Sequence, residues 1–477
     1  MLWLPIDRTS NIPLIRQIYL ELRNKILNAE LKAEQRLPAT RSLAASLGVS
    51  RNVILEAYDQ LIAEGYLEGR SGSGTYVARG ACWEFLPTQR HTEEKMTSLL
   101  TDSPMSLSDK ETGGIDIIDF RSGLPALDSF PRKLWGQLAK QVFTEIPNAL
   151  LGYGQPEGCV ELRSVLSKYL WKTRGVICNP EQIVITSGAT QAFSLVGELL
   201  LKPGSRVILE DPVTRELQKI FIALQAELFP VPVDEQGLQT HLLPPDKKPS
   251  FIFVTPSHQF PLGSVLTIQR RISLLEYAKS TDCFIVEDDY DSEFRYEGTP
   301  VSSLQGLDPE RVIYIGTFSK ILSPALRIGY IVLPVSLVER CRYFKRLKDQ
   351  HTAYFEQLIL AQFIQDGYLE RHIARMKKLY QKRRQILKQN LIDRFADRVK
   401  IFGDSTGLHF VASFPKINFC KKTLQKLESQ GVRIYPVTAH TVFQERHQHQ
   451  VILGYGNLTI SQIEAGIQRL QKSLSDI

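Results

Sequence analysis

The sequence predicts a multidomain chain in which a small α+β domain precedes a large α/β domain. Helical periodicity is dense over residues 12–78 and ends in a Gly/Ser-rich hairpin. From Ile117 onward, strand-like apolar runs alternate with helical stretches, which is typical of βαβ units and a largely parallel sheet. The 477 residues also exceed what a single hydrophobic core usually organises.

The predicted boundaries follow changes in composition along the chain. Residues 1–78 form the N-terminal domain, and the polar, turn-rich residues 79–116 form a linker. Residues 117–477 form the second domain, with a large part at about 150–350 and a small C-terminal part at about 370–477.

Composition excludes several classes of protein. Hydrophobic residues at 43% and charged residues at 23% are globular averages, so most of the chain is expected to fold. The six cysteines are scattered without a CxxC pair, which favours reduced thiols over disulfides or a zinc site, and no metal is predicted. The first residues lack the pattern of a signal peptide, and no apolar run approaches the roughly 20 residues of a membrane span. We therefore expect a cytoplasmic protein without membrane contact.

The N-terminal domain has the pattern of a helix-turn-helix. Apolar residues recur every fourth position from Leu14 to Ile26, which predicts a first helix. Thr40 is the expected N-cap of a second helix, Gly48 supplies a turn, and Ser50 is the expected N-cap of a third helix over 51–64. Two short strands, 66–68 and 75–78, would then form a hairpin.

Residues 36–77 resemble the GntR-type winged helix-turn-helix without a gap, although Ala33-Glu34 stands where that family usually has Pro-Gly. Residues 1–79 carry ten basic and eight acidic side chains, so DNA contact must come from local placement of charge. The resemblance implies double-stranded DNA as a partner. The residues that would face it are Arg41, Ser50, Arg51, Asn52, Arg70 and Ser71. Helix N-termini favour phosphate, and Arg and Asn can read base edges. The alternative is a set of solvated residues on a small interaction module.

In the second domain, polar side chains follow several predicted strands. Lys320 comes after strand 312–317, close to Thr317, Ser319 and Arg327. Alone, a lysine near an arginine would usually be a surface pair. In a partly desolvated pocket, however, such a lysine could form a Schiff base, and the hydroxyls and the arginine could hold a phosphate.

Two further strands end in suitable groups. Strand 283–290 carries Asp288 and Asp289, and Tyr290 follows them. A pyridine cofactor needs a carboxylate beside its ring nitrogen, although an acidic run can also be a solvated loop or a divalent-ion site. Strand 182–187 leads through Gly188 and Ala189 into a helix, whose free backbone N–H groups could bind a phosphate.

Together these segments resemble the fold-type I aminotransferases, and more closely the MocR-type regulators. The motifs that carry the resemblance are FRSGLPALDSFP (120–131), GYGQPEG (152–158), TPSHQFPLG (255–263), EDDYDSEF (287–294), TFSKILSPALRIGY (317–330) and GLHF (407–410). The resemblance covers essentially the whole chain. It implies a winged helix-turn-helix followed by an α/β PLP-dependent transferase fold of type I with a smaller C-terminal α+β subdomain.

The resemblance also implies roles for single residues. Lys320 would form the Schiff base with pyridoxal 5'-phosphate (PLP). Asp288 would pair with the ring nitrogen, with Asp289 as the alternative, and Tyr290 would contact the phenolic oxygen. The residues expected around the phosphate are Gly188, Ala189, Thr317, Ser319 and Arg327.

The sequence departs from catalytic aminotransferases in three places. His258 and Phe260 lie where those enzymes carry an Asn-Pro turn against the cofactor ring, and His258 is expected to contact the cofactor. The run Val213-Thr214-Arg215 stands where such proteins usually place a Tyr that stacks on the cofactor, so Thr214 replaces that ring. No carboxylate-binding arginine is evident near 451–458, and the candidates are Arg215 and Arg433.

We therefore predict a DNA-binding transcription regulator whose second domain senses PLP, an amino acid or an amine. The resemblance further implies a head-to-tail homodimer. The first alternative is a working PLP-dependent aminotransferase with an attached DNA-binding domain, since the parts for a first half-reaction are present. The second is a scaffold without PLP, which would make Lys320 and Asp288 coincidental.

Overall fold

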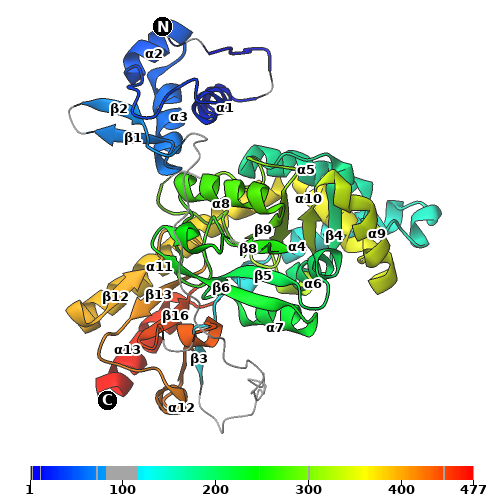
Figure 1. Ribbon diagram of the computed structural model, residues 1–477. Coiled ribbons are helices and arrows are strands. Elements are labelled where there is room, and N and C mark those ends of the chain that lie inside the picture. The colour runs from blue at the N-terminus through cyan, green and yellow to red at the C-terminus, as the bar shows by residue number, and fades with distance from the viewer. Residues whose placement is uncertain are drawn as a thin grey trace.

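The chain folds into an N-terminal head and a body that has a large part and a small part (Figure 1). The structure is a computed structural model. It describes residues 2, 4–10, 12–70, 73–81, 116–245, 248–298, 301–443 and 446–475. Most of the predicted linker therefore lies outside the described residues.

The head contains the predicted helices and hairpin. Its elements are α1 (Leu14–Leu27), α2 (Thr40–Leu47), α3 (Arg51–Ala63), β1 (Leu67–Arg70) and β2 (Gly74–Val77). Gly48 follows α2 at φ 63°, a left-handed conformation that suits glycine. The predicted cap at Thr40 is wrong, because Thr40 is already helical and Ala39 precedes the helix. Ser50 does precede α3, but its side chain makes no capping hydrogen bond.

An eight-stranded sheet forms the centre of the large part, in the order β4-β11-β10-β9-β8-β5-β6-β7. The strands are β4 (Ile183–Thr186), β5 (Arg206–Asp211), β6 (Glu227–Asp234), β7 (Gly237–Leu238), β8 (Phe251–Val254), β9 (Phe284–Asp289), β10 (Val312–Thr317) and β11 (Gly329–Val332). Strand β11 runs antiparallel to both of its neighbours, and β7 runs antiparallel to β6. The other neighbouring pairs are parallel, as the alternating pattern predicts.

Helices cover both faces of this sheet. They are α4 (Arg132–Glu145), α5 (Val160–Arg174), α6 (Ala189–Leu200), α7 (Arg215–Ala223), α8 (Ile268–Thr281), α9 (Val335–Asp349) and α10 (Tyr354–Gln365). Side chains of α6, α7 and α9 pack with alternate residues of the central strands, such as Phe253 and Ile315. The residues next to them in sequence face the other side of the sheet. Ile252 packs with α8, and Tyr314 packs with α5 and α10. Both faces are buried, which explains why the strands are continuous apolar runs.

The small part begins with the long helix α11 (Tyr368–Phe395). Its other elements are β12 (Lys400–Phe402), β13 (His409–Ser413), α12 (Lys421–Ser429), β14 (Val432–Arg433), β15 (Tyr435–Pro436), β16 (Gln450–Gly454) and α13 (Ile460–Ser475). Strand β3 (Ile118–Asp119), at the start of the body, pairs with β14, and Phe120 is fully buried in the core of the small part. The beginning and the end of the body therefore share one core, which the sequence did not indicate.

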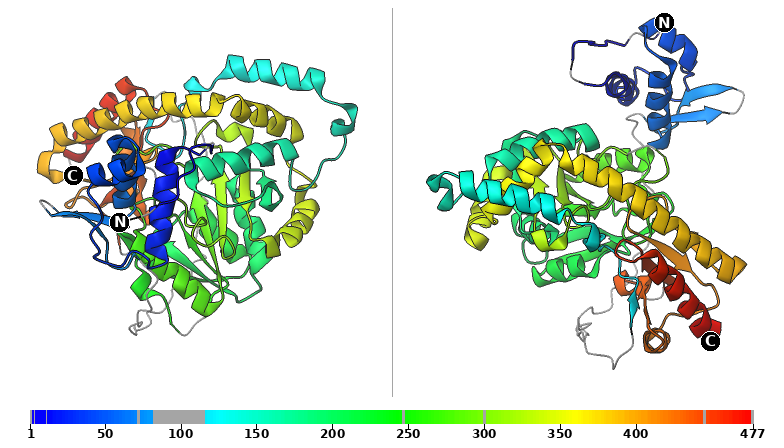
Figure 2. Two further views of the ribbon diagram at one scale, coloured as in Figure 1. Left: turned by 90° about the horizontal axis from the view of Figure 1, so that it is seen from above. Right: turned by 180° about the vertical axis from the view of Figure 1, so that it is seen from behind.

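The head and the small part lie at opposite ends of the molecule. Figure 2 shows the head standing over the large part, with α13 at the far end. No helix among the described residues is long and apolar enough to cross a membrane.

Candidate functional site

The candidate site lies at one edge of the eight-stranded sheet. Strands β4, β9 and β10 run in the same direction, so their carboxyl ends meet there, and antiparallel β11 begins there. This topology brings together Gly188, Asp288, Lys320 and Arg327, which are far apart in sequence. Ligands of open α/β sheets bind at this edge.

A cradle for an anion forms at the start of α6. Gly188 precedes α6 at φ 85°, and a Cβ there would lie 2.6 Å from Nη2 of Arg327. Arg327 itself donates to the carbonyl of Ser187 at 2.7 Å. The hydroxyls of Thr317 and Ser319 lie 3.1 Å apart beside this turn. The backbone N–H groups of the helix, two hydroxyls and one guanidinium suit a phosphate.

Lys320 lies against a glycine from the other end of the body. A Cβ at Gly123, whose φ is 76°, would lie 2.7 Å from Nζ of Lys320, so a larger residue there would push the lysine side chain aside. Burial lowers the pKa of Lys320 from its usual value. A lowered pKa increases the fraction of free amine, which is the form that attacks a carbonyl.

The two adjacent aspartates have different surroundings. Asp289 accepts hydrogen bonds from Nε of Arg174 and from the Tyr314 hydroxyl, both at 2.7 Å. In contrast, Oδ1 of Asp288 is buried with no hydrogen-bond partner among the described residues. Burial, and then the neighbouring Asp289, raise the pKa of Asp288 to about 8, although Lys320 opposes the shift. Asp289 therefore has a charged partner, whereas Asp288 has a buried oxygen without a hydrogen-bond partner among the described residues.

A second cluster contains Tyr290 and His258. The Tyr290 hydroxyl donates to the carbonyl of His258 at 2.9 Å and lies 3.1 Å from its Nδ1. The same Nδ1 lies 2.8 Å from Oδ1 of Asp291, whereas Nε2 of His258 is buried without a described partner. One ligand atom each from His258, Asp291 and His409 lies within 4.8 Å of the others, a spacing that could also hold a metal ion.

The region of the missing stacking ring contains small side chains. Val213 is buried, and Thr214 precedes α7 with its hydroxyl donating to Glu216 at 2.7 Å. Arg215 is half-buried in the first turn of α7. Arg433 is in the small part, where Nε donates to Glu428 at 2.9 Å and Nη1 lies 3.6 Å from Asp119. Arg433 therefore already has two carboxylates beside it.

The predicted DNA-contacting residues of the helix-turn-helix lie on its surface. Arg41, Ser50, Arg51 and Asn52 are all exposed, and Nε of Arg51 lies 3.4 Å from the Thr40 hydroxyl. The α3 N-terminus therefore presents a guanidinium and an amide to solvent. Ser71 lies outside the described residues.

Arg70, in the wing, is already engaged. It pairs with Glu68 and Glu34 and lies 4.5 Å over the Tyr76 ring. To contact DNA, Arg70 would have to give up its ion pairs with Glu34 and Glu68 and bind a phosphate instead. The sequence alone did not indicate these ion pairs.

Sequence reasoning assigned no role to Gly123, Asp291 or Arg174. Gly123 and Asp291 lie inside motifs that carry the family resemblance, and this was an available signal. No pattern in the sequence around Arg174 indicates its role, because its partner Asp289 lies 115 residues away along the chain.

The comparisons with known families agree with this geometry. Residues 14–77 match the family described as bacterial regulatory proteins, gntR family. Residues 115–470 match the family described as aminotransferase class I and II.

Related proteins combine the same parts. Over 98% of this chain and 95% of its relative, the sequence is 36% identical to a probable rhizopine catabolism regulatory protein, MocR, from Rhizobium meliloti. It is 32% identical to the pyridoxine biosynthesis transcriptional regulator PdxR of Corynebacterium glutamicum, over 79% of this chain and 78% of that protein. The body is similar to the crystal structure of a kynurenine aminotransferase from Pyrococcus horikoshii, with a TM-score of 0.71 and 30% identity over 76% of this chain and 91% of that chain.

Proposed function

This chain belongs to the MocR-type, GntR-family transcriptional regulators with an aminotransferase class I/II domain, and from that premise we propose that its body binds PLP on Lys320 as a sensor. The observation that supports this most strongly is the pair formed by Lys320 and Asp288. One is a half-buried lysine with a lowered pKa, and the other is a buried carboxyl that has an oxygen without a described partner at the same sheet edge.

The residues around this pair fit PLP. The phosphate would be held by Gly188, Ala189, Thr317, Ser319 and Arg327, where an added Cβ at Gly188 would strike the guanidinium. Asp288 would pair with the ring nitrogen, and the ion pair of Asp289 with Arg174 favours Asp288 over Asp289 for that role. PLP supplies a carbonyl for amines and a ring that withdraws electrons.

Tyr290 and His258 would face the phenolic side of the ring. The Asn expected there in catalytic enzymes is replaced by Phe260, so the Tyr290 hydroxyl, oriented by the carbonyl of His258, is the remaining donor. Asp291 fixes Nδ1 of His258, so we assign the His258 side chain to orienting Tyr290.

We further propose that the ligand is PLP itself or an amino acid or amine that competes with Lys320. Such a ligand can change DNA affinity only if it binds two conformations of the protein with different affinities. Arg215 is the candidate for the ligand's carboxylate, because Thr214 leaves space where a stacking ring would otherwise lie.

The DNA contacts proposed for the head are Arg41, Ser50, Arg51 and Asn52, with Arg70 in a secondary role. Two heads on repeated half-sites require a homodimer. Its contact surface would be the exposed apolar side chains of the large part, which include Phe143, Leu151, Tyr153, Val335, Tyr343 and Leu347. The head-to-tail arrangement of the two chains remains a prediction.

The second candidate function is a PLP-dependent aminotransferase. The specific observation in its favour is the similarity of the body to the kynurenine aminotransferase at 30% identity, together with the lysine and aspartate in suitable positions. The absent stacking ring and the engaged Arg433 favour sensing over repeated turnover.

The experiment that tests the proposal is DNA footprinting on the region upstream of the protein's own gene, with and without PLP and candidate amines. We expect PLP to produce a visible Schiff-base absorption band and to change the footprint. A footprint that is identical in all conditions, despite the band, would favour the enzymatic function. Release of a keto acid over many cycles would do the same.

A further inference from the structure

The head shares its hydrophobic core with the body. Ile268 and Ile272 of α8 are buried among head residues that include Leu61 and Tyr66. At Gly65, just after α3, a Cβ would lie 3.1 Å from the Ile268 side chain. The end of α3 that is farthest from the predicted DNA-contacting residues therefore packs directly on α8 (Figure 1).

Beside this apolar contact, Glu64 is the centre of a buried polar contact. It accepts a hydrogen bond from the Tyr19 hydroxyl at 2.7 Å and one from the backbone N–H of Ser302 at 3.2 Å. The hydroxyls of Tyr19 and Ser302 lie 3.0 Å apart, and Tyr19 is fully buried. Hydrogen bonds to a buried carboxylate are stronger than those between neutral groups.

Several of the polar contacts on the body side come from one segment, residues 301–306, which we call the bridging loop. Besides Ser302, its Gly306 carbonyl accepts from Nη2 of Arg23 in α1 at 3.0 Å. Arg23 is buried, and its charge lies near the Glu64 carboxylate. The head therefore holds the bridging loop with one anion and one cation.

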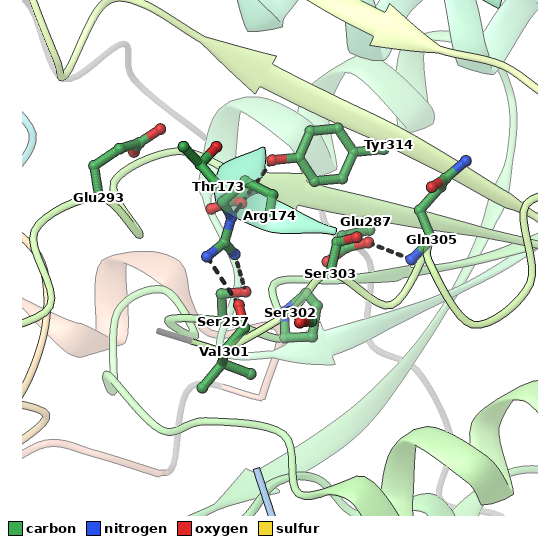
Figure 3. A network of polar contacts seen from close by, with 12 residues as sticks. Thr173, Arg174, Ser257, Glu287, Glu293, Val301, Ser302, Ser303, Gln305 and Tyr314 are labelled. Carbon is green, nitrogen blue, oxygen red and sulfur yellow. Dashed lines mark hydrogen bonds and ion pairs between the residues drawn. The ribbon is translucent and has the colours of Figure 1, made fainter. Parts of the chain in front are cut away.

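The other side of the bridging loop is attached to the candidate cofactor site. Arg174 donates to the Val301 carbonyl at 2.9 Å, to the Ser257 hydroxyl at 2.7 Å and to Asp289 at 2.7 Å. Figure 3 shows the Arg174 guanidinium directed toward Ser257 and Val301. Asp289 is adjacent to Asp288, and Ser257 is adjacent to His258, so one guanidinium joins two candidate cofactor segments to the loop.

Three more hydrogen bonds strengthen this attachment. Glu287, in the same strand as Asp288, accepts from the backbone N–H groups of Leu304 and Gln305 at 3.0 and 2.9 Å. Arg271 of α8 donates to the Ser302 carbonyl at 2.6 Å. Buried polar networks of this kind have discrete arrangements, because a partly satisfied arrangement is costly.

We propose that the bridging loop couples the cofactor site to the head, with Glu64, Tyr19 and Ser302 as positioning residues for DNA binding. Helix α3 is about 20 Å long at 1.5 Å per residue, with Arg51 at the opposite end from Glu64. A change at Asp288 reaches the loop through Glu287, Asp289 and Arg174, and it changes how firmly the head is docked. The docked head is the conformation that PLP stabilises. This inference rests on the proposed function.

Amide hydrogen exchange of the full-length chain, with and without PLP, tests the coupling. In the wild-type protein, PLP should slow exchange over 61–66 and 301–306. Tyr19→Phe and Ser302→Ala should each speed exchange over 61–66 by about tenfold and remove the effect of PLP there, since each loses a hydrogen bond worth about 1.4 kcal/mol.

Two matched variants control for general loosening. Tyr58→Phe removes a buried hydroxyl bond inside the head, to the Pro38 carbonyl, and Ser473→Ala removes one inside the small part, to the Arg469 carbonyl. Both should keep the PLP effect over 61–66. The Schiff-base band should form in all four variants, which separates this proposal from the one before it.

If the Schiff-base absorption band forms but PLP does not change amide exchange over 61–66, the coupling is disproved and PLP binding still stands. The coupling would also be wrong if Tyr19→Phe and Ser302→Ala respond to PLP as the wild type does. Absence of the band would overturn the proposed function, and the coupling with it.

Discussion

Arg174 donates to Asp289 at 2.7 Å, and this buried ion pair gives the two adjacent aspartates at the end of β9 different surroundings. The charge of Asp289 is balanced, and the free oxygen of Asp288 lies at the candidate cofactor site. The pair also attaches the strand to the bridging loop beneath the head.

The first prediction separates the roles of the two aspartates. Asp288→Asn should weaken PLP binding without lowering the thermal stability of the protein. Asp289→Asn should lower the free energy of unfolding by about 3 kcal/mol, because it leaves the buried guanidinium of Arg174 without its charged partner. Absorption titration and denaturation measure the two effects. Equal loss of PLP affinity in both variants would contradict this assignment.

The second prediction concerns Lys320. Lys320→Ala should remove the visible band that PLP gives with the wild-type protein, because the band requires the imine bond. Lys202→Ala, which changes an exposed lysine of the large part, is the control and should keep the band. An unchanged spectrum in Lys320→Ala would rule out the cofactor assignment.

The third prediction concerns pH. The pKa of Asp288 is raised from 3.8 to about 8 by burial and by Asp289, so the folded protein without PLP holds a proton that the unfolded chain releases. Stability from this group is complete below pH 3.8 and is lost as the pH rises toward 8. Between pH 5 and 8, the denaturation midpoint should therefore fall more steeply in the wild type than in Asp288→Asn. Parallel curves for the two proteins would disprove the shift.

The fourth prediction concerns the head. Arg51→Ala should abolish specific DNA protection and leave the PLP absorption band intact, because Arg51 is exposed at the start of α3 and far from Lys320. Arg132→Ala, an exposed arginine of the body, should preserve the footprint. Loss of both DNA protection and the band in Arg51→Ala would indicate misfolding.

The fifth prediction concerns salt. DNA affinity should fall at least tenfold between about 50 and 200 mM salt, because basic side chains on phosphates release counterions. Fluorescence anisotropy at several salt concentrations measures the slope. A flat response would exclude docking of the α3 N-terminus against the DNA backbone.

The sequence by itself determined the two domain types and their order, the strands and helices of the sheet, and the segments that carry Lys320, Asp288 and Arg327. These features are local, because apolar periodicity, turn residues and contiguous motifs all lie within short stretches of chain. The same local signals predicted a cap at Thr40, which is wrong because cap position depends on the exact first turn.

Only the tertiary structure decided which aspartate pairs with a buried guanidinium, because the partner of Asp289 is Arg174, 115 residues earlier. It also brought Gly123 to Lys320, engaged Arg433 with acidic neighbours and joined Glu64 to Ser302 across 238 residues. Side chains so distant in sequence meet only when the sheet and the head pack. Short-range sequence patterns therefore cannot predict these contacts.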